Sequence, residues 1–368
     1  MAPAGSTGQI LFKLHFVPPG TVLVPALGRI GVDVGNLLGY GVLDHHQMES
    51  EDECAASLVM RYPHYVVDHL KGLPVEDITL VTHIRPDLDA VTAAFFCHCL
   101  LVEGHLPQFS QKIADYVRDV DRGVCFRQAG TINTVYGIYT GLSELASIES
   151  RELGLSEDAL CRLQMECGFS LWRYALSRIN NNTDLHSSEI FNGPHSFREA
   201  QDLITGDYPV YIDDLHQAEM KQFIIPRKDG HGAGIVDGLL AVNPHSLLFK
   251  SWARSDNLHA CLGGGFTLLA TNRNHERYVI SINPESPYTL KGLGILLEDA
   301  ETEKRQRLGK MRTGSVRPGY KGPDPWYDGR SPLHNFSIVD TPHGGTVLTW
   351  EEIVSLLHRF SESHSVAQ

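Results

Sequence analysis

The segment Ile78–Ala90 constrains the fold more than any other part of the chain, because it predicts a strand, a sharp turn and a helix in direct succession. The run Ile78–Thr82 is short, apolar and rich in β-branched residues, which is typical of a buried strand. Pro86 cannot continue a ladder and disfavours helical geometry at Arg85, so the chain must turn there. From Ala90 onward the sequence is apolar and compatible with a helix. In open α/β sheets, ligands bind at the loop that follows the carboxyl end of such a strand.

This turn carries one imidazole and two carboxylates, in the pattern His83-x-x-x-Asp87-x-Asp89. Two ionised carboxylates that lie close together repel each other, and Arg85 alone matches two separate groups poorly. A divalent cation would offset both charges, with the imidazole as a nitrogen ligand and the aspartates as oxygen ligands. The alternative is purely structural: Asp89 caps the following helix, and Asp87 lies in the turn.

Two further predicted strands end in side chains of the same kind. Asp33 ends the apolar run Gly28–Val32, and the triplet Asp44-His45-His46 follows the run Gly39–Leu43. Two adjacent histidines are weak evidence alone, but a pair that directly follows an aspartate at a strand end is more specific. We therefore expect these groups to meet the first motif at one edge of a sheet.

Together these segments resemble the DHH phosphoesterase superfamily, which includes manganese-dependent pyrophosphatases, exopolyphosphatases, single-strand exonucleases and phosphodiesterases of short RNA or cyclic dinucleotides. Family members carry His-x-x-x-Asp-x-Asp-Ala on one strand, a lone Asp ending a second, Asp-His-His on a third, and a later Asp. The residues that match, all within 28–126, are His83, Asp87, Asp89, Ala90, Asp33, Asp44, His45, His46 and Asp121.

The last of these motifs offers two aspartates. Asp121-Arg122-Gly123 followed by Phe126 resembles the family's Asp-Thr-Gly…Phe motif and closes a helix predicted from about residue 111. This resemblance favours Asp121 as the site residue, with Asp119 as the alternative.

The order of the motifs departs from the family pattern. There the His-x-x-x-Asp-x-Asp motif comes first, whereas here Asp33 and Asp44-His45-His46 precede it. A parallel sheet tolerates reordered strands if each ligand still arrives at the same edge, so the resemblance implies a permuted member of the family. A milder alternative is a coincidental Asp-His-His match, which leaves a one-metal site.

The resemblance implies two divalent cations that activate a water against a phosphodiester or phosphoanhydride bond, with Mn²⁺ as the first choice and Mg²⁺ or Co²⁺ as alternatives. One cation would take Asp33, His83 and Asp87. The other would take His45, Asp89, Asp121 and the shared Asp33. Three further residues are expected to act in catalysis: Asp44 would orient an imidazole, His46 would contact the phosphoryl oxygen, and Arg85 would add positive charge.

Two segments of the second half are candidates for substrate binding. Gly263-Gly264-Gly265 resembles the family's Gly-Gly-Gly-His loop, although Phe266 replaces the histidine. The segment 317–330 is rich in Pro and Gly, so its aromatics and cations lie on a shaped loop that can stack a base or pair with phosphate. The residues predicted for this role are Arg317, Trp326 and Arg330. The alternatives are a flexible loop at the glycines and aromatics that pack the long loop onto the core.

Alternating strand-like and helix-like segments predict an α/β chain with a mostly parallel sheet, helices on both faces and a smaller C-terminal α/β domain. We predict a metal-binding core over 1–126, a mainly helical extension and linker over 127–229, and a substrate-binding domain over 230–368. The extension includes a helix near Leu215–Phe223, and the turn-rich Pro226–Gly232 marks its end. A last helix is expected over Trp350–Phe360, with Thr349 as its N-cap.

Composition limits the classes of binding partner that we expect for this chain. A net charge of −13 argues against long nucleic acid and leaves a small phosphorylated or nucleotide substrate. Seven cysteines without a Cys-x-x-Cys pair predict reduced thiols in a cytoplasmic protein. No apolar run approaches the roughly 20 residues that span a bilayer, so no membrane partner is expected. A homo-oligomer remains open. The rival functions are a mononuclear metallohydrolase and a non-catalytic nucleotide- or phosphate-binding module.

Overall fold

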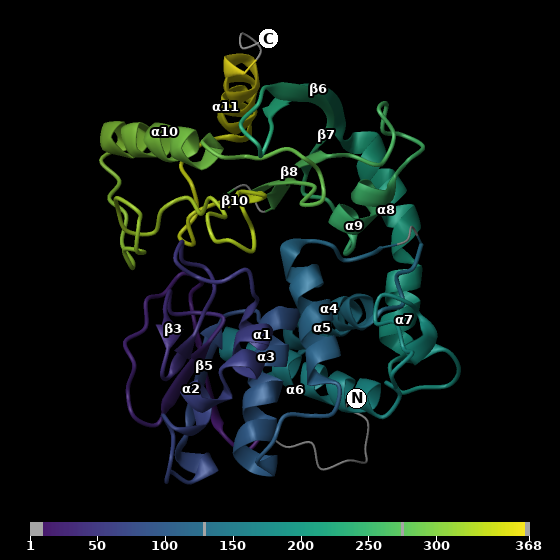
Figure 1. Cartoon of the computed structure of the whole chain (residues 1–368). Helices are drawn as coiled ribbons and strands as arrows, with labels where there is room; N and C mark the ends of the chain where they lie inside the picture. Colours follow the sequence, from purple (N-terminus) through teal and green to yellow (C-terminus); the bar gives the residue numbers. More distant parts are fainter. Residues whose placement is uncertain (1–9, 128–129, 274–275, 365–368) are drawn as a thin grey trace. The chain divides into compact units, whose positions relative to one another are not determined.

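The computed structural model describes residues 10–127, 130–273 and 276–364, and the chain divides into two compact units, Met1–Gly206 and Asp207–Gln368 (Figure 1). Both units are of the α/β class, each built around a five-stranded mixed sheet, which confirms the predicted class. Each unit is described by itself below.

The sheet of the first unit has the order β1-β5-β2-β4-β3. Its first four members are mutually parallel, and only the short β3 pairs antiparallel, with β4. The carboxyl ends of the four parallel strands therefore meet at one edge. The strand bounds are β1 Lys13–Val17, β2 Arg29–Val32, β3 Leu38–Gly39, β4 Val42–Leu43 and β5 Thr79–His83.

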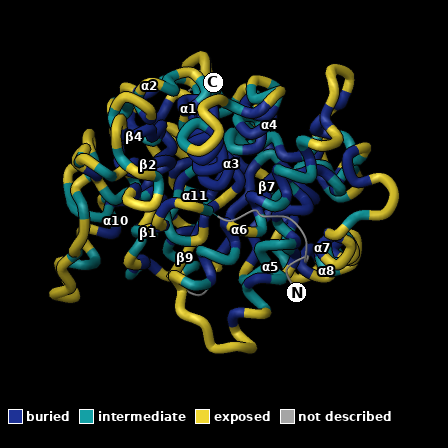
Figure 2. Tube along the Cα trace, turned by 90° about the horizontal axis from the view of Figure 1, so that it is seen from below, coloured by how far each residue is buried: buried dark blue, intermediate teal, exposed yellow. Residues whose placement is uncertain are grey.

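The helix α3 is the centre of this unit, because all its residues from Leu88 to His98 are buried (Figure 2). The sequence of α3 has no continuous polar face, which is typical of a helix that is covered on every side. The other helices are α1 Ala55–Arg61, α2 Pro63–Val67, α4 Ser110–Arg122, α5 Val135–Leu153, α6 Glu157–Leu176 and α7 Arg198–Thr205, with short turns η1 Val75–Asp77, η2 Cys99–Glu103 and η3 Glu189–Phe191.

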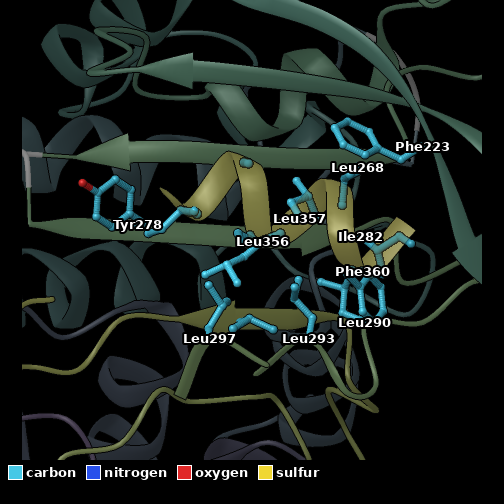
Figure 3. Close-up of a cluster of buried hydrophobic side chains, with 14 of the residues drawn as sticks. Phe223, Leu268, Tyr278, Ile282, Leu290, Leu293, Leu297, Leu356, Leu357 and Phe360 are labelled. Carbon is cyan, nitrogen blue, oxygen red and sulfur yellow. The ribbon is translucent and has the colours of Figure 1, made fainter. Parts of the chain in front are cut away.

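The second unit has the strand order β10-β9-β8-β7-β6, in which only β7 and β8 run parallel. Its core is a cluster of aliphatic and aromatic side chains between the sheet and the helices α10 and α11, including Phe223, Leu293 and Leu357 (Figure 3). The bounds are β6 Glu219–Pro226, β7 Ala233–Val242, β8 Leu268–Arg273, β9 Arg277–Ile282, β10 Ile338–Asp340, α8 Asp207–Gln217, α9 Phe249–Ser255, α10 Leu293–Leu308 and α11 Trp350–Ser363.

The structure divides the chain at a different place from the sequence. The predicted extension is not a unit of its own, since α5, α6 and α7 belong to the first unit and α8 and β6 to the second. The turn-rich segment Pro226–Gly232 closes a hairpin instead, in which Arg227 N–H donates to the Gly232 carbonyl at 3.1 Å. Turn composition is the same for a hairpin as for a linker, so it could not distinguish them.

The predicted helix at Leu215–Phe223 is also wrong in its second half. Helix α8 ends at Gln217, and Phe223 lies in β6 with its ring in the core. The prediction at the end of the chain is confirmed: the Thr349 hydroxyl accepts from the Glu352 N–H and so caps α11. Among the described residues, no helix has the length and apolar character needed to cross a membrane.

Candidate metal centre

Three strand ends of the first unit bring acidic and imidazole groups together. Asp33 directly follows β2, the Asp44-His45-His46 triplet follows β4, and His83 is the last residue of β5. Oδ1 of Asp33 lies 3.2 Å from Nε2 of His45, and its Oδ2 lies 3.1 Å from Nε2 of His83. One carboxylate thus joins two imidazoles that come from different strands.

The turn after Asp33 depends on unusual backbone conformations. Asp33 and Asn36 have φ values of 57° and 54°, in the left-handed region that favours glycine. Gly35 has a φ of 126°, and a Cβ there would lie 2.5 Å from Cγ1 of Val42. Asn36 was not among the predicted site residues, although Gly-Asn after a strand is a turn signal. Its backbone N–H donates to Oδ2 of Asp44 at 2.6 Å.

Asp87 and Asp89 have different partners. Asp87 caps α3, since its side chain accepts from Ala90 N–H at 3.0 Å, and its Oδ2 lies 4.0 Å from Nε2 of His83. Asp89 accepts from Ala55 N–H at 2.7 Å and from Ala56 N–H at 2.8 Å, so it binds the amino end of a second helix, α1. The structural alternative therefore holds in part, but the capping residue is Asp87 rather than Asp89. Asp87 and Asp89 both remain within the cluster while they make these contacts.

Helix α4 places Asp121 and Asp119 differently. Oδ2 of Asp121 lies 3.4 Å from Nε2 of His45, which itself lies 3.7 Å from Oδ2 of Asp89. Asp119 instead pairs with Nε2 of His186 at 3.2 Å and with Arg127. The geometry thus brings Asp121, and not its alternative, to the cluster.

Within the cluster, two groups of three residues have ligand atoms that all lie within 4.8 Å of one another: Asp33, His83 and Asp87, and His45, Asp89 and Asp121. They have the same members as the two ligand sets that the family resemblance implies, apart from the sharing of Asp33. Asp33 also belongs to a third such group, with Asp44, His45 and His46.

The electrostatics of the cluster reflect an excess of buried negative charge. Burial, together with the negative charge of the neighbouring Asp33, raises the pKa of Asp89 to about 7. Burial also holds the pKa of Asp121 well above its usual value, opposed by His45 and reinforced by Asp89. Burial acts to raise the pKa of Asp33 as well, but hydrogen bonds with His45 and His83 lower it.

The neighbouring carboxylates raise the pKa values of the buried imidazoles His45 and His83 against the effect of burial. Burial alone would lower the pKa of His83, but its hydrogen bond with Asp33 raises that pKa to about 10. The carboxylates of Asp33, Asp89 and Asp121 are thus buried close together, and the imidazoles of His45 and His83 oppose their mutual repulsion. This set of carboxylate oxygens and imidazole nitrogens could hold divalent cations, whose positive charge would offset the repulsion.

Both carboxylate oxygens of Asp44 form hydrogen bonds with neighbouring groups. Its Oδ1 lies 2.6 Å from Nδ1 of His46 and accepts from His45 N–H at 2.7 Å. This contact favours the proton on Nδ1 of His46 and directs Nε2 away from the carboxylate. The His46 side chain is 27% exposed, so it is the imidazole of the triplet that a substrate can reach.

The predicted role of Arg85 is not reflected in its contacts. Its side chain is 66% exposed, and its Nε lies 3.6 Å from a carboxylate oxygen of Glu157 on α6. The charge of Arg85 is therefore directed to an exposed partner and not to the carboxylates of the cluster.

The predicted substrate residues of the second unit take part in its own packing. Trp326 is 1% exposed and belongs to the core. Arg330 forms a two-point ion pair with Asp328 at 2.8 and 2.7 Å, and Arg317 lies over the Tyr327 ring at 5.1 Å. These contacts favour the alternative in which the long loop packs onto the core.

The glycine triplet is a true conformational requirement. Gly263, Gly264 and Gly265 have φ values of 75°, 74° and 78°, and a Cβ at Gly265 would overlap the Arg254 carbonyl oxygen. The first two glycines are exposed, so a role in binding stays a prediction.

Comparison with models of protein families, with curated proteins and with solved structures finds no match to this chain. The geometry of the cluster and the motifs are therefore the observations that bear on function.

Proposed function

We propose that this protein is a divalent-metal-dependent phosphohydrolase, a permuted relative of the DHH phosphoesterases, that cleaves a phosphodiester or phosphoanhydride bond of a nucleotide-type substrate. The observation that carries the proposal is the position of Asp33, whose two oxygens lie 3.2 and 3.1 Å from imidazoles of two separate ligand groups. A carboxylate that joins two such groups is the arrangement that a two-cation site needs.

The order of the parallel strands supports the same proposal. In the sheet, β2 lies between β5 and β4, so Asp33 emerges between the loops that carry His83 and His45. The motif order along the chain differs from the family pattern, but in this chain Asp33, the Asp44-His45-His46 triplet and His83 still meet at one edge of the sheet. Metal geometry depends on this position in space and not on chain order.

When bound, two divalent cations would lower the pKa of a shared water and offset the charge of the attacked phosphate. The chain's own residues do the rest. Asp44 holds the imidazole of His46, whose partly exposed side chain can donate a hydrogen bond from Nε2 to a phosphoryl or leaving-group oxygen when both ring nitrogens carry a proton. The amino end of α1, through Ala55 and Ala56, stabilises the negative charge of Asp89.

The test combines metal analysis with turnover. The wild-type protein, dialysed against Mn²⁺, should retain two equivalents per chain and hydrolyse at least one of bis-p-nitrophenyl phosphate, pyrophosphate and short oligonucleotides. Asp87→Ala and His45→Ala should each abolish turnover while the far-ultraviolet circular dichroism spectrum is unchanged. Asp115→Ala is the matched control, since Asp115 is a half-exposed aspartate of α4 that pairs with Arg118.

Three outcomes contradict the proposal. One retained equivalent per chain favours the mononuclear metallohydrolase. Tight nucleotide binding without turnover on any of the three substrates favours the non-catalytic binding module. Full activity in both His45→Ala and Asp87→Ala removes the assignment of these residues.

A further inference from the structure

The loop between β5 and α3 joins two of the three members of one ligand group, because His83 and Asp87 lie at its two ends. Its backbone is hydrogen-bonded at both ends within the sheet and helix. Ile84 N–H donates to the Val17 carbonyl at 2.8 Å, and Val91 N–H donates to the Asp87 carbonyl at 3.1 Å. In the middle of the loop, the Arg85 N–H and the Pro86 carbonyl bond instead to side chains outside the sheet.

Those contacts come from side chains of α5 and α6. The hydroxyl of Tyr139, on α5, donates to the Pro86 carbonyl at 2.5 Å. The N–H of Arg85 donates to Sγ of Cys161, on α6, at 3.1 Å. Tyr139 is 4% exposed and Cys161 is fully buried, so water does not compete for either bond.

These two bonds act on a strained stretch of backbone. Arg85 has a φ of 54°, a left-handed conformation that is unfavourable for a residue with a Cβ. The residue before a proline relaxes most easily to an extended conformation. Such a relaxation would rotate the peptides between His83 and Asp87 and move the two side chains relative to each other. The contacts from α5 and α6 oppose it.

We propose that Tyr139 and Cys161 are positioning residues that hold the 83–87 loop in the form in which His83 and Asp87 can bind one cation. The inference rests on the proposed function, in which a cation binds there. It assigns a task to α5 and α6, which are otherwise distant in sequence from the motifs. The second ligand group does not depend on these contacts, because α1 holds Asp89 and α4 carries Asp121.

The effect of losing either contact should therefore be selective. In Tyr139→Phe, one of the two Mn²⁺ affinities should fall by about 10-fold or more. The remaining equivalent should keep its wild-type affinity. Cys161→Ala should show the same selective loss. Cys161→Ser retains an acceptor for the Arg85 N–H and should restore part of the affinity.

The measurement is a Mn²⁺ titration by calorimetry, with the electron paramagnetic resonance signal of free Mn²⁺ as a second count. A readout independent of metal is hydrogen–deuterium exchange of peptides that cover 84–87 in the metal-free protein, which should be faster in both variants. Tyr211→Phe is the matched control, because Tyr211 is a buried tyrosine of the second unit whose hydroxyl donates to Asp256 at 2.7 Å. Cys167→Ala, on the same helix α6, is the control for Cys161.

The outcomes separate the two proposals. A wild-type protein that binds no Mn²⁺ contradicts the proposed function. A wild-type protein that binds two equivalents, together with Tyr139→Phe and Cys161→Ala variants that bind both with unchanged affinity, contradicts the positioning role alone. An equal weakening of both equivalents also contradicts it, since a general loss of stability would act on both groups.

Discussion

Nε2 of His83 lies 3.1 Å from Oδ2 of Asp33, although fifty residues separate them in the chain. The contact exists because β5 and β2 are parallel neighbours, with Arg29 opposite Thr79, so that both strands end at the same edge. Asp33 is buried and makes a similar contact with His45 on its other oxygen. The same residue therefore links both candidate ligand groups.

This link predicts that Asp33 and Asp87 differ in their effect on metal binding. Asp33→Ala should remove both Mn²⁺ equivalents, because each group loses its shared carboxylate. Asp87→Ala should remove one, since Asp87 belongs to the group of His83 alone. Calorimetric titration of the two variants measures the difference. Loss of a single equivalent in both variants would show that Asp33 does not bridge.

The repulsion within the cluster predicts a change in stability that reverses with metal. Because burial and neighbouring carboxylates raise the pKa of Asp121, the site favours its neutral form, which Asn resembles. Metal-free Asp121→Asn should be more stable than metal-free wild type at pH 8, by roughly 1 kcal/mol. With Mn²⁺ the order should reverse, because the variant loses a charged ligand.

Thermal unfolding with and without Mn²⁺ checks this prediction. Asp115→Asn is the control, since Asp115 lies on α4 but outside the cluster, and its stability should respond to Mn²⁺ as the wild type does. A metal-free Asp121→Asn variant that is less stable than wild type would contradict the proposed repulsion.

The contact of Asp44 with His46 predicts a loss of turnover without a loss of metal. In Asp44→Asn the amide cannot accept from the ring and the backbone as the carboxylate does, so His46 loses its fixed orientation. Turnover of bis-p-nitrophenyl phosphate should fall by about 10- to 100-fold, while two Mn²⁺ equivalents remain bound. A parallel loss of metal would instead place Asp44 among the ligands, as the grouping of Asp33, Asp44, His45 and His46 allows.

We expect the stability of the second unit to depend on pH through the side chain of Asp256. Burial acts to raise its pKa, but hydrogen bonds from Tyr211 and His259 outweigh this and lower the pKa below the usual value of 3.8. The unfolded chain therefore takes up the proton first as the pH falls. The stabilisation is complete above about pH 5 and is lost as the pH falls through 4 and below.

Tryptophan fluorescence can follow this loss, because Trp252, Trp326 and Trp350 lie in the second unit and only Trp172 lies in the first. In urea unfolding at pH 7, the Asp256→Asn variant should be less stable than the wild-type protein. This difference in the free energy of unfolding should shrink towards pH 3. A difference that stays constant between these pH values would show that the charge of Asp256 is not its cause.

The motifs and the local signals predicted several elements of both units. The strand before His83, the capping of α11 by Thr349 and the strand-end positions of Asp33 and Asp44 all follow from short-range rules of apolar runs, prolines and capping residues. Short-range rules failed where two structures share one local pattern. Residues 226–232 form a hairpin turn rather than a linker, and Phe223 lies in a strand rather than in a helix.

The exposed or buried state of a polar group is also a tertiary property. The sequence shows that Arg330 and Trp326 lie on a loop rich in Pro and Gly, but it does not show that Asp328 pairs with the arginine or that the indole enters the core. The same holds for Tyr139 and Cys161, which carry no motif and reach the 83–87 loop only through the packing of α5 and α6.

The sequence by itself determined which side chains stand at strand and helix ends, because turns, caps and apolar periodicity act over a few residues. Only the tertiary structure decided which of them meet. Asp121 rather than Asp119 reaches His45, and one carboxylate lies between two imidazoles, because the pairing order of parallel strands and the rotation of α4 are set by contacts between distant segments.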